Sequence, residues 1–160
     1  MQNMNADLAK NTSSAGGHAE RDRATFNSWE QRVGDALRNI GDRSLLNQNP
    51  LARSSYIERL AAENYRGRLL PRGLALHDVL LACVEKVFSE VSHEPGLARA
   101  CTYLQLSVEG LTCREIGRRL NLSREHVSRV YRRKAIELVT EELVFRIKNA
   151  SVNSNPPAAN

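Results

Sequence analysis

Apolar side chains recur every three or four residues along most of this sequence, and no five-residue run alternates as a strand would. Steps of three and four keep side chains on one stripe of an α-helix. Hydrophobic residues make up 41% of the 160 residues and aromatic residues 5%, which is enough for an aliphatic core and too much for a disordered chain. The sequence therefore predicts an all-α fold, a helical bundle.

The two ends of the chain lack this pattern. Residues 1–23 are rich in Asn, Ser, Gly and Ala, and residues 150–160 contain two consecutive prolines and almost no large apolar residue. Neither segment can bury enough apolar surface to offset the entropy lost on ordering. We expect both segments to be flexible, disordered tails.

Residues 24–96 are expected to form a helical module with a regulatory or dimerisation role. Its first helix is predicted to run from an N-cap at Thr25 to a stop at Gly41. A second helix is predicted to begin with Asn49 as its N-cap and Pro50 as its first residue. Residues 76–88 form the most apolar helix of the chain. We expect this helix to lie at the centre of the core.

The net charge of +5 is concentrated in one short segment. Residues 112–134 carry eight basic side chains and two carboxylates, whereas basic and acidic residues nearly cancel in the rest of the chain. A solvated protein surface usually mixes the two signs. The segment therefore indicates a polyanionic partner.

Local signals in this segment predict two helices joined by a tight turn. Thr112 heads a capping box, and Gly117 is small enough to let a second helix approach. Asn121 tolerates the positive φ of a tight turn, and Ser123 can cap the helix that follows. Because these signals occur together, we interpret residues 97–149 as a helix-turn-helix domain.

The helix after the turn has one basic, hydrogen-bonding face, which suits the major groove of DNA. Periodicity places Val127, Val130 and Tyr131 on its apolar side and Ile136, unexpectedly, on the basic side. Base contacts are expected from Arg124, Glu125, His126, Ser128 and Arg129. Phosphate contacts are expected from Thr112, Arg114, Arg118, Arg119, Arg132 and Arg133.

The run LTCREIGRRLNLSREHVSRV at residues 111–130 resembles region four of bacterial sigma factors and the related (LuxR-type) helix-turn-helix of response regulators. The resemblance covers about residues 99–139. It implies DNA binding through the matching positions, which are Thr112, Arg114, Arg124, Glu125, His126, Ser128, Arg129 and Arg132. Asn121 stands where the family often has glycine. The chain offers no counterpart of the aromatic- and acid-rich helices with which sigma factors engage polymerase, so the resemblance implies a DNA reader and not a sigma factor.

No combination of residues points to a metal, a cofactor or a catalytic site. The three cysteines lie in apolar-periodic stretches and have no ligand spacing to the four histidines. The sequence contains no G-x-S-x-G, P-loop, H-E-x-x-H or G-x-G-x-x-G motif. We therefore expect a protein that is not an enzyme, without metal or cofactor, whose cysteines are small buried hydrophobes.

No stretch approaches the ~20 apolar residues that a membrane span needs, and residues 1–18 contain no apolar run that could serve as a secretory signal. We expect a bacterial cytoplasmic protein associated with the nucleoid, with no membrane partner.

The leading functional hypothesis is a sequence-specific regulator of transcription that binds double-stranded DNA with its helix-turn-helix in the major groove. The alternative is an adaptor with the same fold, whose basic helix binds RNA polymerase or another regulatory protein. A homodimer is expected because many helix-turn-helix proteins bind two-fold sites. The apolar residues after position 137 either fold onto the core or pair with a second copy. A hydrolase or nuclease would need clustered carboxylates or metal ligands, which the sequence lacks.

Overall fold

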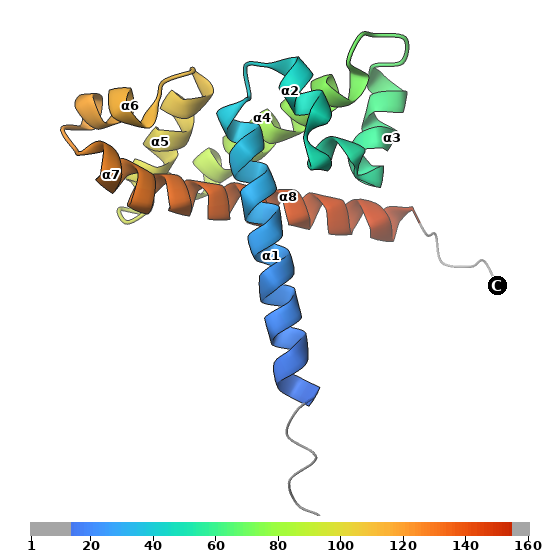
Figure 1. Cartoon of the computed structure of the whole chain (residues 1–160), viewed down its shortest axis with the longest axis horizontal. Coiled ribbons are helices and arrows are strands. Elements are labelled where there is room, and N and C mark those ends of the chain that lie inside the picture. Colours follow the sequence, from blue (N-terminus) through green and yellow to red (C-terminus); the bar gives the residue numbers. More distant parts are fainter. Residues whose placement is uncertain (1–13, 155–160) are drawn as a thin grey trace, which may run out of the picture.

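The computed structural model describes residues 14–154, in which helices follow one another without a strand (Figure 1). The elements are α1 (Ser14–Arg38), α2 (Arg43–Gln48), the 3-10 helix η1 (Pro50–Arg53), α3 (Ser55–Asn64), α4 (Pro71–Val91), α5 (Ala98–Val108), α6 (Cys113–Leu120), α7 (Arg124–His126), the π-helical segment η2 (Val127–Arg132) and α8 (Arg133–Asn153). The prediction of an all-α fold is confirmed.

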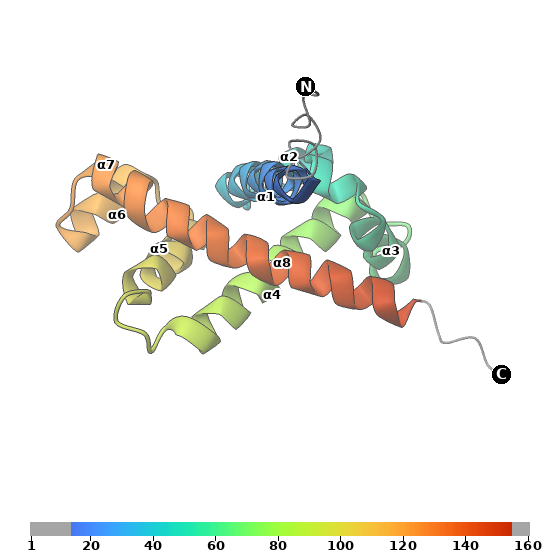
Figure 2. The same cartoon turned by 90° about the horizontal axis from the view of Figure 1, so that it is seen from below.

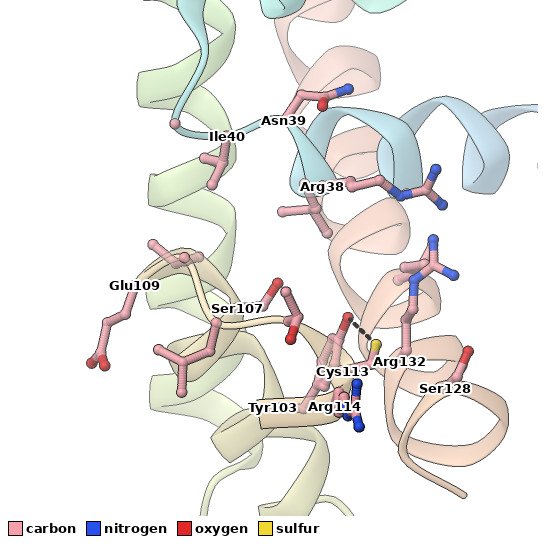
Figure 3. Close-up of a pocket in the computed structure, with 18 of the residues that line it drawn as sticks. Arg38, Asn39, Ile40, Tyr103, Ser107, Glu109, Cys113, Arg114, Ser128 and Arg132 are labelled. Carbon is pink, nitrogen blue, oxygen red and sulfur yellow. Dashed lines mark hydrogen bonds between the residues drawn. The ribbon is translucent and has the colours of Figure 1, made fainter. Parts of the chain in front are cut away.

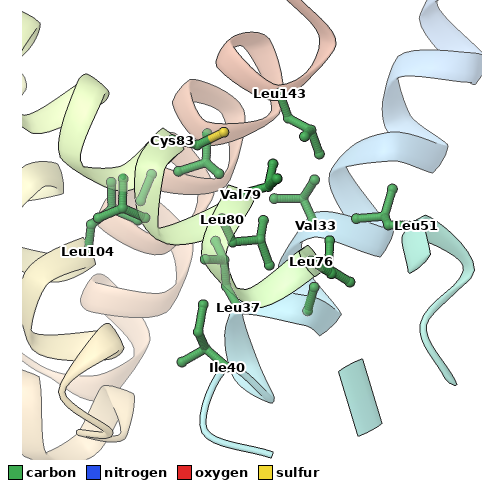
Figure 4. Close-up of a cluster of buried hydrophobic side chains, with 14 of the residues drawn as sticks. Val33, Leu37, Ile40, Leu51, Leu76, Val79, Leu80, Cys83, Leu104 and Leu143 are labelled. Atoms are coloured by element: carbon green, nitrogen blue, oxygen red, sulfur yellow. The ribbon is translucent and has the colours of Figure 1, made fainter. Parts of the chain in front are cut away.

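Helix α4 is the central helix, as the sequence predicts. It contacts α2, α3, α5, α8 and η1. Leu76, Leu80 and Cys83 of this helix are 0% exposed. Figure 4 shows this part of α4 between the side chains of Val33 from α1 and Leu104 from α5. The core therefore joins the N-terminal helices to those that carry the basic segment, in one continuous cluster of buried side chains.

Segments α7, η2 and α8 form one continuous helix, residues 124–153, which we call the reader helix. The residues at the two joins keep right-handed helical backbone angles. The reader helix begins beside α6 at one end of the molecule and then crosses α4 and α1 (Figures 1 and 2). Its C-terminal apolar residues Val139 and Leu143 are buried in the core of this chain. The N-terminal end of the reader helix is thus fixed to the body of the protein.

The π-helical segment sets the burial pattern of the reader helix. The buried positions Val127, Ala135, Val139 and Leu143 are four or eight residues apart. In an ideal α-helix each step of four residues turns the side chain by about 40° away from a straight stripe. The wider turn of η2 takes up part of this rotation, so the four side chains reach the same core.

One prediction for this helix is wrong because it assumed an uninterrupted α-helical period: Val130 was expected on the apolar side and is 46% exposed. Ile136 lies, as expected, on the side of Ser128 and Arg132. This part of that side packs against α1, where a Cβ on Gly34 would lie 3.0 Å from the Cδ1 of Ile136. Gly34 therefore allows α1 to approach the reader helix closely.

Helices extend into both segments that were predicted to be disordered tails, residues 1–23 and 150–160. Helix α1 begins at Ser14, so residues 14–23 are helical, and Thr25 is no cap because its hydroxyl donates to the carbonyl of Arg21 at 2.8 Å. Once the second half of α1 is packed, each residue that extends it adds one hydrogen bond without a new nucleation cost, and Ala19, Glu20 and Arg21 are good helix formers. Helix α8 likewise continues to Asn153. Residues 1–13 and 155–160 lie outside the described part of the chain.

The second predicted helix is divided into two elements. Asn49 caps η1 by accepting from the amide of Leu51 at 2.9 Å, and its side chain donates to the carbonyl of Arg32 at 3.2 Å. Ser54 then has extended backbone angles and caps α3, which ends the first element. Helix α2, capped by Asp42, was not predicted, since six residues are too few to show a period.

We expect Gly73→Ala to lower the free energy of unfolding by about 1–3 kcal/mol, because it overpacks a well-filled contact. A Cβ at this position would overlap the carbonyl oxygen of Arg43 in α2. The Gly73 amide also donates to the side chain of Asn47 at 3.1 Å, so displacing α2 would weaken that bond. Urea unfolding measures the effect. Gly96→Ala is the control, since nothing lies within 4 Å of its Cβ position, and equal midpoints for both variants would contradict this packing.

Candidate nucleic-acid interface

The first helix of the basic segment, α6, begins with a complete capping box, as predicted. The hydroxyl of Thr112 accepts from the amide of Glu115 at 3.3 Å. The carboxylate of Glu115 accepts in return from the Thr112 amide at 2.7 Å and from its hydroxyl at 3.1 Å. These bonds, the one from the Thr112 amide first, lower the pKa of the Glu115 carboxyl. The charged carboxylate therefore helps to fix the start of α6.

We expect the stability contributed by Glu115 to be lost in acid. A carboxyl whose pKa is lower in the folded state stabilises the fold above its unfolded pKa, and this contribution disappears as the pH falls through the lowered value. The difference in Tm between the protein and Glu115→Ala should narrow between about pH 7 and about pH 3. The side chain in Glu115→Gln cannot titrate, so the difference in Tm between Glu115→Gln and Glu115→Ala should be the same at every pH. If the difference in Tm between the unchanged protein and Glu115→Ala were also independent of pH, the prediction would be contradicted.

The turn between α6 and the reader helix has the predicted geometry. Asn121 lies in the left-handed region at φ 55°, and the amide of Leu122 donates to the carbonyl of Gly117 at 2.8 Å. A Cβ at Gly117 would lie 2.7 Å from the carbonyl oxygen of Leu122 and 3.5 Å from the amide nitrogen of Arg124, so this glycine makes room for the turn and for the first residue of the reader helix. The hydroxyl of Ser123 accepts from the amide of His126 at 3.1 Å and caps the reader helix.

Buried apolar contacts hold the two helices in a fixed relation. Ile116 of α6 and Val127 of η2 are both 0% exposed and belong to the main core. On the other side of the reader helix, the hydroxyl of Tyr131 accepts from Arg99 of α5 at 3.3 Å. The ring of His126 packs edge-on against Tyr131, with centroids 5.4 Å apart. The reader helix is therefore attached to α5 as well as to α6.

The structure places most of the predicted contact residues on the surface. Among the predicted base contacts, Arg124, Glu125, His126 and Arg129 are exposed. Among the predicted phosphate contacts, Thr112, Arg114, Arg118, Arg119 and Arg133 are exposed. All of these come from α6 and the first three turns of the reader helix, at one end of the molecule (Figure 2).

Among the residues that the structure describes, no carboxylate forms an ion pair with the exposed arginines of this surface. Within residues 14–154, the ion pairs of the molecule involve other residues, and the basic segment contributes only the pair between Lys134 and Glu137 at 3.2 Å. Arginines that were part of a neutral salt-bridged face would be paired with carboxylates. The unpaired cations instead leave a positive surface available to a polyanion.

Two of the predicted contact residues, Ser128 and Arg132, are half-buried. They face the C-terminal end of α1 and line a cavity together with Arg38 and with the exposed Arg114 and Arg124. Sequence reasoning missed Arg38 because it belongs to a helix almost a hundred residues earlier. No local signal could have found it, since only tertiary packing brings α1 to the reader helix.

The described residues include all three cysteines, and their structure also bears on the predictions about metal ligands and membrane spans. Cys83 and Cys101 are buried and Cys113 is half-buried, each with a free thiol, and burial raises the pKa of Cys83 to about 12. Residues 14–154 contain no group of three or more His, Cys, Asp or Glu side chains that could hold a metal ion. In the same part of the chain, no helix combines the length and the apolar character needed to cross a bilayer.

Comparison with known proteins agrees with this geometry. Residues 99–134 match the family model of sigma-70 region 4. No curated protein and no solved structure matches the chain. The matched segment runs from α5 to the beginning of α8 and includes the capping box, the tight turn and the exposed arginines. The match indicates DNA binding in transcription. Residues 99–134 are therefore a helix-turn-helix of the sigma-70 region 4 type within a longer all-helical chain.

Proposed function

We propose that the chain is a sequence-specific regulator of transcription that binds double-stranded DNA through this helix-turn-helix. The observation that carries the proposal is the group of exposed arginines without acidic partners on α6 and the reader helix. Residues 24–96 would hold this unit and have the regulatory or dimerisation role, and the protein would act on the nucleoid in the bacterial cytoplasm.

The reader helix would enter the major groove with its N-terminal end foremost. Arg124 and Arg129 have the donors to bond guanine bidentately, and Glu125 can accept from the amino group of cytosine. His126 and Ser128 would complete the base contacts. A half-buried Ser128 is consistent with this role if the DNA backbone approaches beside α1.

The exposed basic side chains of α6 would hold the DNA backbone on one side of the groove. The hydroxyl of Thr112 and the guanidinium groups of Arg114, Arg118 and Arg119 would contact phosphates there. Arg132 and Arg133, farther along the reader helix, would also contact the backbone. Such contacts fix the register of the protein without selecting a sequence.

Selection of bound oligonucleotides from a random duplex pool tests this function. We expect one enriched motif that binds at least about a thousandfold more tightly than unrelated duplex at physiological salt. The full chain should be used, because the reader helix is part of the common core. Equal affinity for the enriched and unrelated duplexes would contradict sequence-specific regulation.

The match to sigma-70 region 4 also favours a second candidate, an adaptor that binds RNA polymerase or another regulatory protein. In that case the basic face would bind an acidic protein surface. Titration of labelled protein with purified core RNA polymerase, with and without competing duplex, separates the two functions. Tight polymerase binding together with weak, sequence-indifferent DNA binding would favour the adaptor.

We also propose that the protein acts as a homodimer. Phe145 and Val152 of α8 are 60% and 71% exposed, which leaves apolar surface for a second copy. A dimer should select a motif with two-fold symmetry, whose half-sites are one helical turn apart or a multiple of that spacing. Light scattering coupled to size exclusion measures the mass, and a monomer at all concentrations with an asymmetric motif would contradict the dimer.

A further inference from the structure

A cavity of about 920 Å³ lies between the C-terminal end of α1 and the helix-turn-helix (Figure 3). Its volume falls within the range of about 300–1,000 Å³ that is common for small-molecule sites. It is lined by the end of α1, by α5, by the beginning of α6 and by the reader helix. No part of the proposed DNA contact requires a hollow of this kind.

Four arginines line the cavity: Arg38, Arg114, Arg124 and Arg132. Figure 3 shows the guanidinium groups of Arg38 and Arg132 pointing toward each other. The contacts of α1 agree with this view, because a Cβ on Gly34, one turn before Arg38, would lie 3.9 Å from a terminal nitrogen of Arg132. Two cations are thus directed at the same space from different helices.

Two carboxylates, Asp42 and Glu109, also line the cavity, but within residues 14–154 neither forms an ion pair with the four arginines. Arg38 has one ion pair, with the exposed Asp35 at 3.8 Å. Over residues 14–154, no carboxylate comes within ion-pair distance of Arg114, Arg124 or Arg132. Since cations that face each other repel, an anion between Arg38 and Arg132 would be bound by both.

The wall behind the arginines is apolar. Leu37 of α1, Ile40 of the turn after α1, and Tyr103 of α5 are buried and line the cavity. The hydroxyl of Tyr103 lies 3.9 Å from the Sγ of Cys113. A phosphate of the DNA backbone would approach from the surface and leave this wall unused. A small molecule with an apolar or aromatic portion would cover it.

We propose that this cavity binds a small phosphorylated ligand, with one phosphoryl group between Arg38 and Arg132 and an apolar or aromatic portion against Leu37, Ile40 and Tyr103. Arg124 and Arg132 are also proposed DNA contacts. The ligand therefore competes with DNA for the same arginines, and this regulatory part of the inference rests on the proposed function.

Calorimetric titration of the full chain with ADP, pyrophosphate and adenosine tests ligand binding without DNA. We expect ADP to bind with one site per chain, pyrophosphate to bind more weakly, and adenosine to bind most weakly. Arg38→Gln should weaken ADP binding about tenfold or more, the loss expected for a hydrogen bond to a charged group. This side chain is 62% exposed at the end of a helix, so the fold should tolerate the change.

Arg68→Gln is the matched control, because Arg68 is exposed in the connector between α3 and α4 and does not line the cavity. It should bind ADP like the unchanged protein. If neither ADP nor pyrophosphate binds, or if Arg38→Gln binds ADP as tightly as Arg68→Gln, the proposal is wrong. If Arg38→Gln weakens only duplex DNA binding, Arg38 contacts a backbone phosphate and the ligand site is again refuted.

Competition is measured separately, with a labelled duplex and increasing ADP. We expect ADP to raise the apparent Kd for the duplex in the unchanged protein and to have little effect in Arg38→Gln. If ADP binds by calorimetry but leaves the duplex bound, the cavity is a ligand site that does not regulate DNA binding, and the regulatory part fails. If the chain binds no duplex at all, the proposed function fails while the calorimetric result still stands.

Discussion

Arg129→Ala is expected to reduce affinity for the selected DNA motif by about 1–3 kcal/mol and to relax the preference at one base position. Arg129 is exposed on the second turn of the reader helix and has no ion pair within residues 14–154. Its guanidinium is therefore free to bond a guanine bidentately. Removing a base contact affects one position of the motif and leaves the others unchanged.

The measurement compares binding to the motif and to its single-base variants. Arg53→Ala is the matched control, since Arg53 is exposed on η1, away from the helix-turn-helix. It should bind all duplexes like the unchanged protein. A uniform loss over every base variant would show that Arg129 contacts phosphate, and no loss at all would contradict its place in the interface.

The double change Arg114→Ala, Arg118→Ala is expected to weaken binding to every duplex alike and to flatten its salt dependence. Both side chains are exposed on α6, a separate helix that packs against α7 and η2 of the reader helix. Each lost phosphate contact should reduce the slope of log K against log salt by about 0.9. The loss of affinity should therefore be largest at low salt.

Arg66→Ala, Arg68→Ala removes the same charge from an exposed connector and serves as the control. If both double variants change the slope of log K against log salt equally, the change in salt dependence comes from net charge and not from the position of the arginines on α6. A change in base preference for the α6 variant would contradict its proposed role in holding the backbone.

Local structure around the site was predictable because it depends on residues close in sequence. The capping box of Thr112 and Glu115 and the positive φ of Asn121 follow from the side chains themselves. The buried stripe of α4 follows from an unbroken helical period. These features account for the all-α fold and for the helix-turn-helix.

Features that depend on tertiary packing were not predictable in this way. The π-helical segment shifts the faces of the reader helix, so Val130 is exposed. The packing of Ile136 on Gly34 of α1 joins residues about a hundred positions apart. The same contact brings Arg38 beside Arg132. Nothing within a few residues of either arginine signals the other, and the cavity between them could only be found in three dimensions.

The exposed arginines of α6 and the reader helix should contact DNA directly. NMR of arginine side-chain Nε–Hε groups during titration with the selected duplex measures this contact for each residue. We expect shifts for Arg114, Arg118, Arg124 and Arg129 and no shift for Arg53 or Arg68. Shifts confined to arginines outside residues 112–133, or no shifts at a duplex excess that saturates binding, would contradict direct contact.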